Sequence, residues 1–304
     1  MRDRPIGVFD SGLGGLTVLQ ALIDLLPGED LIYLGDTARY PYGDRSPAEL
    51  QRSSAVITDH LVDLGVKLIV VACNSATAAA LPVLRERSPV PVIGVIEPGL
   101  RAAASVSRTG RAVVIGTRVT AASAVYERTA ERLELGLTVT TLACPGLVEL
   151  VEEGETEGPR AERTVRERLA PLLTARVDTL VLGCTHFPLL ARPISEVVGR
   201  HVTLVSSADE TAFEVRDLLQ RTGWLRDRDD GGYRRVLTTG DAERFRELGQ
   251  RFLGVPLVDV TAHAFAALGD VQLVPPDGGP MADRANQGAT VTEHQETPEE
   301  VPRA

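Results

Sequence analysis

The chain has 304 residues, enough for two domains of ordinary size with a hydrophobic core each. Its formal net charge is -10 and Lys67 is its only lysine, which argues against a nucleic-acid partner. The first residues turn polar too early for a signal peptide, and no apolar run reaches the roughly 18 residues that span a bilayer. We therefore expect a cytoplasmic protein that has no membrane partner.

Apolar runs of strand length alternate with helical patterns along the chain. The first half of the chain has expected strands at 6–9, 30–36, 68–73 and 92–96 and expected helices at 14–26, 47–65, 75–87 and 98–106. The rhythm then restarts with strands at 112–117, 139–144, 179–184 and 202–207, helical patterns at 118–134 and 209–223, a short strand at 236–240 and a helix at 241–254. This order predicts an α/β fold with mostly parallel sheets covered on both faces.

The restart resembles an internal duplication. Shifting the chain by 111 residues, which is 184 minus 73, places Cys184 on Cys73 and aligns the apolar runs before them. Smaller offsets place Thr117 on Ser11 and Cys144 on Asp36. We predict two doubly wound domains, one formed by 1–97 plus about 208–270 and the other by 98–207. Residues 275–304 are rich in Pro, Gly and Glu, and we predict a disordered acidic tail there.

Polar side chains gather where the expected strands end. Ligands of doubly wound sheets bind at these carboxyl ends. The residues concerned are Asp10, Ser11, Asp36, Cys73, Asn74, Ser75, Thr117, Cys184, Thr185 and His186. Two facing halves would thus present two thiols to one cleft, and a stereoinverting proton transfer needs an acid and a base on opposite sides of one carbon.

The glycines of residues 10–15 do not indicate a nucleotide site. The string DSGLGG lacks the third glycine of the dinucleotide fingerprint, and no phosphate-loop motif occurs in the chain, so a phosphate cofactor is disfavoured. Backbone N–H groups at a helix start could instead hold a small anion such as a substrate carboxylate. A tight turn without a ligand is the alternative.

Protonation sets a condition on two-thiol chemistry. One cysteine must be a thiolate while the other is a thiol, and a helix start lowers the pKa of a cysteine. We expect both Cys73 and Cys184 at such starts, with Asp10 and His186 placed to exchange protons with them. The charge that develops on the substrate carboxylate would be stabilised by nearby donors, for which Ser11, Asn74, Ser75 and Thr185 are suitable.

Each cysteine also has a simpler interpretation. A cysteine that closes a buried strand is usually a small apolar packing residue, and we assign that role to Cys144. Cys73, Cys184 and His186 could alternatively supply three zinc ligands, although a fourth ligand is not evident. We interpret His60, His201 and His263 as surface or packing residues and Glu153 as a solvated side chain.

Six motifs in order resemble one enzyme family. IGVFDSGLGGLTVL, YLGDTARYPYG, VACNSATAAAL, CPGLVELVEEG, LGCTHFPLL and LVSSADETA are similar to glutamate racemases, from about Ile6 to Gly254. The resemblance implies two pseudosymmetric domains with the active site between them, a cofactor-independent and metal-free reaction that supplies D-glutamate for peptidoglycan, and a homodimer. It implies catalytic roles for Cys73, Cys184, Asp10, Glu152 and His186, with Cys73 serving D-glutamate and Cys184 serving L-glutamate. It implies substrate contacts from Asp10, Ser11, Pro41, Tyr42, Gly43, Asn74, Ser75, Thr117, Thr185 and His186.

Two positions depart from the family pattern. Ser75 stands where a threonine is usual, which keeps the hydroxyl and loses a methyl contact, and Glu149 replaces a frequent proline three residues before Glu152. Two other functions stay open from the sequence. One is a related two-thiol racemase acting on aspartate or a hydantoin, and the other is a non-catalytic module that binds an acidic amino acid or blocks a DNA-handling partner.

Overall fold

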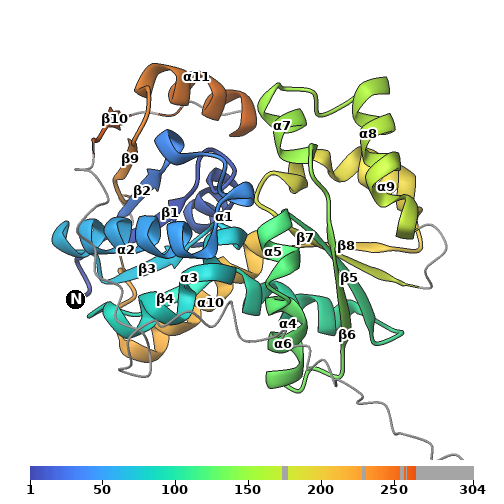
Figure 1. The fold of residues 1–304 in the computed structure, drawn as a ribbon. Coiled ribbons are helices and arrows are strands. Elements are labelled where there is room, and N and C mark those ends of the chain that lie inside the picture. Colours follow the sequence, from blue (N-terminus) through green and yellow to red (C-terminus); the bar gives the residue numbers. More distant parts are fainter. Residues whose placement is uncertain (173–176, 228–230, 254–256, 258, 265–304) are drawn as a thin grey trace, which may run out of the picture. The chain divides into compact units, whose positions relative to one another are not determined.

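The computed structural model describes residues 1–172, 177–227, 231–253, 257 and 259–264 (Figure 1). All the described residues belong to one compact unit, and the predicted tail at 275–304 lies outside the described residues. All the strands described pair in parallel within two sheets. Among the described residues, none of the helices combines the length and the apolar character needed to cross a membrane.

The first sheet has six strands in the order β10-β9-β2-β1-β3-β4. Their bounds are β1 (Ile6–Asp10), β2 (Leu31–Gly35), β3 (Leu68–Val71), β4 (Val92–Gly94), β9 (Arg234–Thr238) and β10 (Val260–Ala262). The chain therefore returns to this sheet after completing the second one. Successive residues of β1 alternate between two cores, with Ile6 and Val8 in one and Phe9 in the other, because the side-chain period of a strand is two.

The second sheet has four strands in the order β6-β5-β7-β8. Their bounds are β5 (Arg111–Gly116), β6 (Thr138–Ala143), β7 (Thr179–Gly183) and β8 (Thr203–Ser206). This order repeats the β2-β1-β3-β4 part of the first sheet strand for strand, as the predicted duplication requires. The α/β prediction with mostly parallel sheets is confirmed, whereas the division into domains at 97 and 208 stays a prediction.

Helices follow most strands and cover the sheets (Figure 1). Those that pack around the first sheet are α1 (Leu16–Leu25), α2 (Pro47–Asp63), α3 (Asn74–Arg87), α10 (Ser207–Thr222) and α11 (Ala242–Leu253), and the others are α4 (Ile96–Val106), α5 (Arg118–Ala122), α6 (Val125–Arg132), α7 (Leu147–Glu152), α8 (Pro159–Leu169) and α9 (Ala191–Val198). Ser46 starts α2 with a capping box, in which its hydroxyl accepts from Glu49 N and the Glu49 carboxylate accepts from Ser46 N. Asp241 precedes α11 and caps it, since Asp241 Oδ1 accepts from Arg244 N at 2.7 Å.

One predicted helix is broken in the structure. The pattern at 118–134 indicated a single helix, but α5 ends at Ala122 and α6 begins at Val125. Ala124 between them has a φ of 48°, in the left-handed region that residues other than glycine rarely adopt. The residues around the break are neither Gly nor Pro, which is why the sequence did not reveal it.

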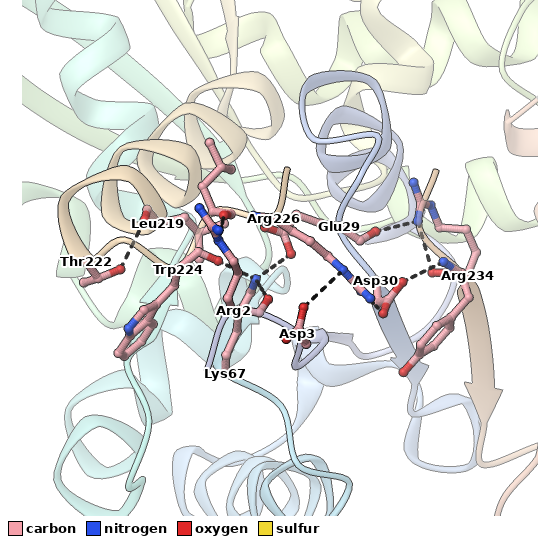
Figure 2. Close-up of polar contacts among 12 residues, drawn as sticks. Arg2, Asp3, Glu29, Asp30, Lys67, Leu219, Thr222, Trp224, Arg226 and Arg234 are labelled. Atoms are coloured by element: carbon pink, nitrogen blue, oxygen red, sulfur yellow. Dashed lines mark hydrogen bonds and ion pairs between the residues drawn. The ribbon is translucent and has the colours of Figure 1, made fainter. Parts of the chain in front are cut away.

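The only lysine of the chain forms a buried ion pair at the amino-terminal edge of the first sheet (Figure 2). Lys67 Nζ lies 2.5 Å from Glu29 Oε2 and also donates to the carbonyl oxygens of Arg2 and Trp224. All three ammonium protons are thereby used. Because Lys67 directly precedes β3, the pair joins the first sheet to the segment after α10. Cys73 follows the other end of β3.

Candidate active site

A cavity opens where β1 and β3 of the first sheet and β5 and β7 of the second sheet end. Most of the residues predicted from the sequence line it, namely Ser11, Pro41, Tyr42, Gly43, Cys73, Asn74, Ser75, Thr117, Cys184, Thr185 and His186. Cys73 comes from the first sheet and Cys184 from the second, and both are free and buried. Three predicted residues, Asp10, Asp36 and Glu152, are not among its lining residues, although Glu152 contacts His186, which is.

Cys73 caps the amino terminus of α3. Its sulfur accepts from Ala76 N at 3.5 Å, so the expected helix start is present. The expected lowering of its pKa is wrong, however. Burial and the nearby Asp10 carboxylate raise the pKa of Cys73 well above its ordinary value and outweigh the helix amides. Cys73 is therefore a thiol at neutral pH in this structure, ready to donate a proton.

Asp10 ends β1 beneath the glycine loop. Its Oδ2 accepts from Gly12 N at 3.1 Å and from Gly15 N at 2.9 Å. Its Oδ1 is buried and has no hydrogen-bond partner among the described residues. A buried carboxylate oxygen without a partner is costly, so it marks a place where a proton or a donor can be received.

The glycines of this loop permit close packing between the two halves of the chain. A Cβ at Gly14 would collide with Thr185 Oγ1 and lie 2.5 Å from His186 Nδ1, and a Cβ at Gly15 would collide with Asp10. The loop therefore touches the residues that follow Cys184. Its glycines are needed for this approach, which is consistent with the absence of a complete nucleotide fingerprint.

Cys184 belongs to a hydrogen-bonded row of three side chains. His186 Nδ1 lies 3.9 Å from Cys184 Sγ, and His186 Nε2 lies 2.8 Å from Glu152 Oε1. Burial alone would lower the pKa of His186, but the hydrogen bonds with Cys184 and Glu152 outweigh it and raise that pKa to about 10. The imidazole is thus protonated at neutral pH. The expected helix start at Cys184 is wrong, because a 3₁₀ turn at Phe187–Leu190 follows it.

Hydroxyl and amide groups from both halves meet across the cavity. Ser75 Oγ and Thr117 Oγ1 are 2.9 Å apart, so the hydroxyl kept at position 75 is engaged. Thr117 also caps α5 by accepting from Thr120 N. Gly43 packs against Thr117, since a Cβ there would approach its side chain to 2.9 Å. These contacts hold donors in place around the two sulfurs.

Several cavity residues were not among those predicted. Tyr40, Asp44, Arg118, Cys144, Pro145, Gly146, Val148 and Glu149 complete the lining. Asp44 and Arg118 form an ion pair of 2.9 Å between the two halves, with both side chains exposed. Cys144 was assigned to packing, although the repeat that aligned it with Asp36 placed it at a strand end. Its place at a strand end was therefore the signal in the sequence that could have assigned Cys144 to the cavity.

Metal-ligating side chains are not grouped here in the way that the zinc alternative requires. In the part of the chain that the structure describes, no three His, Cys, Asp or Glu side chains are arranged to hold a metal ion. His60 and His263 do not line the cavity, and their rings are stacked with 4.1 Å between the centroids.

The chain is similar to known proteins over most of its length. A profile of the Asp/Glu/Hydantoin racemase family matches residues 6–214. A glutamate racemase from Beutenbergia cavernae is 50% identical over 286 residues, which cover 89% of this chain and 96% of that protein. The crystal structure of a glutamate racemase isoform from Bacillus anthracis has a TM-score of 0.83 at 41% identity and covers 86% of this chain and 98% of its own.

A third similar protein was crystallised with a ligand. The glutamate racemase of Francisella tularensis in complex with D-glutamate has a TM-score of 0.81 at 31% identity, covering 89% of this chain and 100% of that one. The profile match spans more than half of the chain, and the two similar structures share its fold over most of their length. This chain therefore belongs to the Asp/Glu/Hydantoin racemase family.

Proposed function

We propose that this chain is a glutamate racemase that interconverts L-glutamate and D-glutamate by proton transfer at Cα between Cys73 and Cys184. The observation that carries the proposal is that both thiols line one cavity, one from each sheet. Relatives that cover most of the chain at about half identity bear that name, and a similar structure holds D-glutamate. The reaction class is an isomerisation.

The two thiols take opposite roles in each direction. With L-glutamate, the Cys184 thiolate removes the α-proton and the Cys73 thiol protonates the opposite face of the carbanion. With D-glutamate, the Cys73 thiolate removes the proton and Cys184 returns one. The raised pKa of Cys73 supports a resting enzyme in which this residue carries its proton. An enzyme with its proton on Cys73 is ready to react with L-glutamate, because Cys73 is the proton donor in that direction.

The neighbours of each sulfur restore its proton. His186 contacts Cys184 and is held by Glu152, so the imidazolium can give a proton to that sulfur and take it back. Asp10 serves Cys73 in the same way through its unpartnered Oδ1. The two halves thus use different chemical groups, a carboxylate on one side and a carboxylate-bound imidazole on the other.

Acid and base groups alone do not account for the rate. A positioned general base contributes roughly 10² to 10⁴, whereas enzymes commonly reach at least about 10⁶. We assign the remainder to donors that face the substrate carboxylate, namely Ser11, Ser75 and Thr185, which line the cavity. Asn74 also lines the cavity, and we propose that it contacts the substrate through its side-chain oxygen. Pro41, Tyr42, Gly43 and Thr117 are proposed to contact the rest of the substrate.

Isotope exchange tests the reaction. The chain is incubated with L-glutamate or D-glutamate in D₂O while circular dichroism follows the loss of optical activity. Both enantiomers should racemise, and the product should carry deuterium at Cα. Cys73→Ser and Cys184→Ser should each abolish racemisation, and turnover at the wild-type rate in either variant would contradict the assignment. Failure of the wild type to exchange would favour a binding module.

The substrate needs its own test because the family name also includes aspartate and hydantoin racemases. A panel of L-glutamate, L-aspartate and a 5-substituted hydantoin should show a kcat/KM for glutamate that is at least about 100-fold higher. A difference of this size is what one methylene and a charged group in a shaped site can give. A preference for aspartate would overturn the substrate and leave the two-thiol mechanism in place.

Three further features belong to the proposal. We infer that the reaction needs no cofactor, that D-glutamate serves peptidoglycan synthesis, and that the enzyme is a cytoplasmic homodimer. The support for these is the resemblance of the sequence motifs to the glutamate racemases. Sedimentation of the purified chain decides the dimer, because a monomer at micromolar concentration would exclude a stable one.

A further inference from the structure

Tyr126 is a buried side chain beside the cavity that has no assigned role. It lies on α6 of the second half of the chain, and its ring is fully buried among apolar residues of the second sheet. Its hydroxyl oxygen accepts a hydrogen bond from Asn74 Nδ2 at 2.8 Å. Because Asn74 begins α3 directly after Cys73, this hydrogen bond crosses from one half of the chain to the other.

The same hydroxyl also lies next to the strand that carries the second thiol. A Cβ built at Gly183 would be 3.3 Å from the Tyr126 hydroxyl oxygen, so the hydroxyl packs against the backbone immediately before Cys184. One oxygen atom therefore contacts the residue after Cys73 and approaches the residue before Cys184.

The Asn74 amide is fixed by this contact. Its Nδ2 is used by Tyr126, while its Oδ1 is buried, belongs to a cavity-lining residue and has no partner among the described residues. An amide that flipped would offer an N–H group where it now offers an acceptor. With Oδ1 free, Asn74 can accept from the ammonium group of an α-amino acid.

The backbone before Tyr126 is strained in a way that serves this placement. Ala124 lies in the left-handed region with a φ of 48°, and the turn it makes separates α5 from α6. Strained positions of this kind persist where the surrounding structure fixes them, often near functional sites. Here the turn lies between Thr117, which caps α5 and lines the cavity, and Tyr126, which is buried on α6.

We propose that Tyr126 is a positioning residue for racemisation, which acts by orienting the side-chain amide of Asn74 across the two halves of the chain. The inference rests on the proposed function, since it concerns the same substrate. Tyr126 itself does not line the cavity, so it acts through Asn74 and has no direct contact with glutamate. Its hydroxyl is the part that matters, and its ring supplies packing.

A double-mutant cycle tests the inference. The variants are Tyr126→Phe, Asn74→Ala and the combination, each assayed for kcat and KM with both enantiomers. Tyr126→Phe should lower kcat/KM about fivefold to tenfold, the effect of one neutral hydrogen bond, mainly through a higher KM. In the Asn74→Ala background the same change should have almost no effect, because the group on which it acts is gone.

Controls separate positioning from folding and from the proposed function. Tyr233→Phe alters a tyrosine that is 49% exposed and should leave kcat/KM at the wild-type value. Thermal melts establish that each variant is folded at the assay temperature. If the wild type racemises glutamate and Tyr126→Phe has the same kcat/KM, the inference is overturned and the proposed function stands. An equal loss in both Asn74 backgrounds would also overturn it, whereas an inactive wild type would instead refute the proposed function.

A measurement on the wild type does not depend on how Tyr126→Phe folds. The side-chain amide protons of Asn74, assigned by their loss in Asn74→Ala, should exchange with solvent at least about tenfold more slowly than those of an exposed asparagine. Exchange at the exposed rate would mean that the amide is not held, and it would overturn the inference.

Discussion

Glu152 Oε1 lies 2.8 Å from His186 Nε2, although the two residues are 34 positions apart in the chain and come from different elements. The contact places a carboxylate behind the imidazole that touches Cys184. The hydrogen bonds of His186 with Cys184 and with Glu152 together outweigh burial and raise the pKa of the imidazole, so that it stays protonated. The proton supply on the Cys184 side of the cavity therefore depends on a residue that does not line it.

Replacing Glu152 should shift the alkaline limit of activity. Glu152→Gln keeps the shape and removes the negative charge, so the pKa of His186 should fall from about 10 toward its ordinary value of 6.5. The pH profile of kcat should then lose its alkaline side at lower pH, by one unit or more. An unchanged profile would show that Glu152 does not control this proton. Glu153→Gln, whose carboxylate pairs with Arg160 on the surface, is the matched control.

The raised pKa of His186 should also make stability depend on pH. A group whose pKa is raised by folding stabilises the protein fully below its ordinary pKa and loses that contribution as pH rises through the folded value. For His186 the loss should run from about pH 6.5 toward pH 10. Urea titrations between pH 6.5 and 9 should show a falling free energy of unfolding, and the slope should flatten in His186→Asn. Equal slopes in the two proteins would contradict this linkage.

Adding a methyl group at Gly14 should damage the site directly. Gly14→Ala would drive a Cβ into Thr185 and His186, so the loop or the Cys184 side must move. We expect kcat/KM to fall at least about 100-fold, since small displacements of reacting groups have effects of this size. Gly12→Ala in the same loop puts its methyl 3.4 Å from Tyr40, an ordinary contact, and should lose much less. A comparable loss of kcat/KM in both variants would mean that the loop's backbone flexibility, and not the collision at Gly14, is responsible.

The buried pair at the other edge of the sheet should affect stability without affecting catalysis. Lys67→Met leaves Glu29 buried without its counter-ion and should cost about 3–5 kcal/mol of unfolding free energy. The exposed pair of Arg87 and Asp59 is the comparison, and Arg87→Met should cost less than about 1 kcal/mol. Below the melting temperature, Lys67→Met should keep the wild-type kcat/KM. A loss of turnover in folded protein would place Lys67 in a role that its position does not explain.

The local patterns of the sequence predict every strand of the described residues except β10, most of the helices, and the strand ends at which Cys73 and Cys184 lie. These follow from local patterns, because an apolar run and the residues that end it are neighbours in the chain. The repeat at an offset of 111 residues also indicated that the two sheets share a strand order. The motifs that resemble glutamate racemases pointed to the same family as the profile match.

Tertiary structure decided which side chains meet and how they are charged. The contacts of Glu152 with His186, Asn74 with Tyr126 and Asp44 with Arg118 join segments that no local pattern connects. The protonated state of Cys73 reversed the expectation from its helix start, because burial and a neighbouring carboxylate outweigh a few amide dipoles. Such effects depend on distance and exposure in space, and a one-dimensional pattern of residue types contains neither.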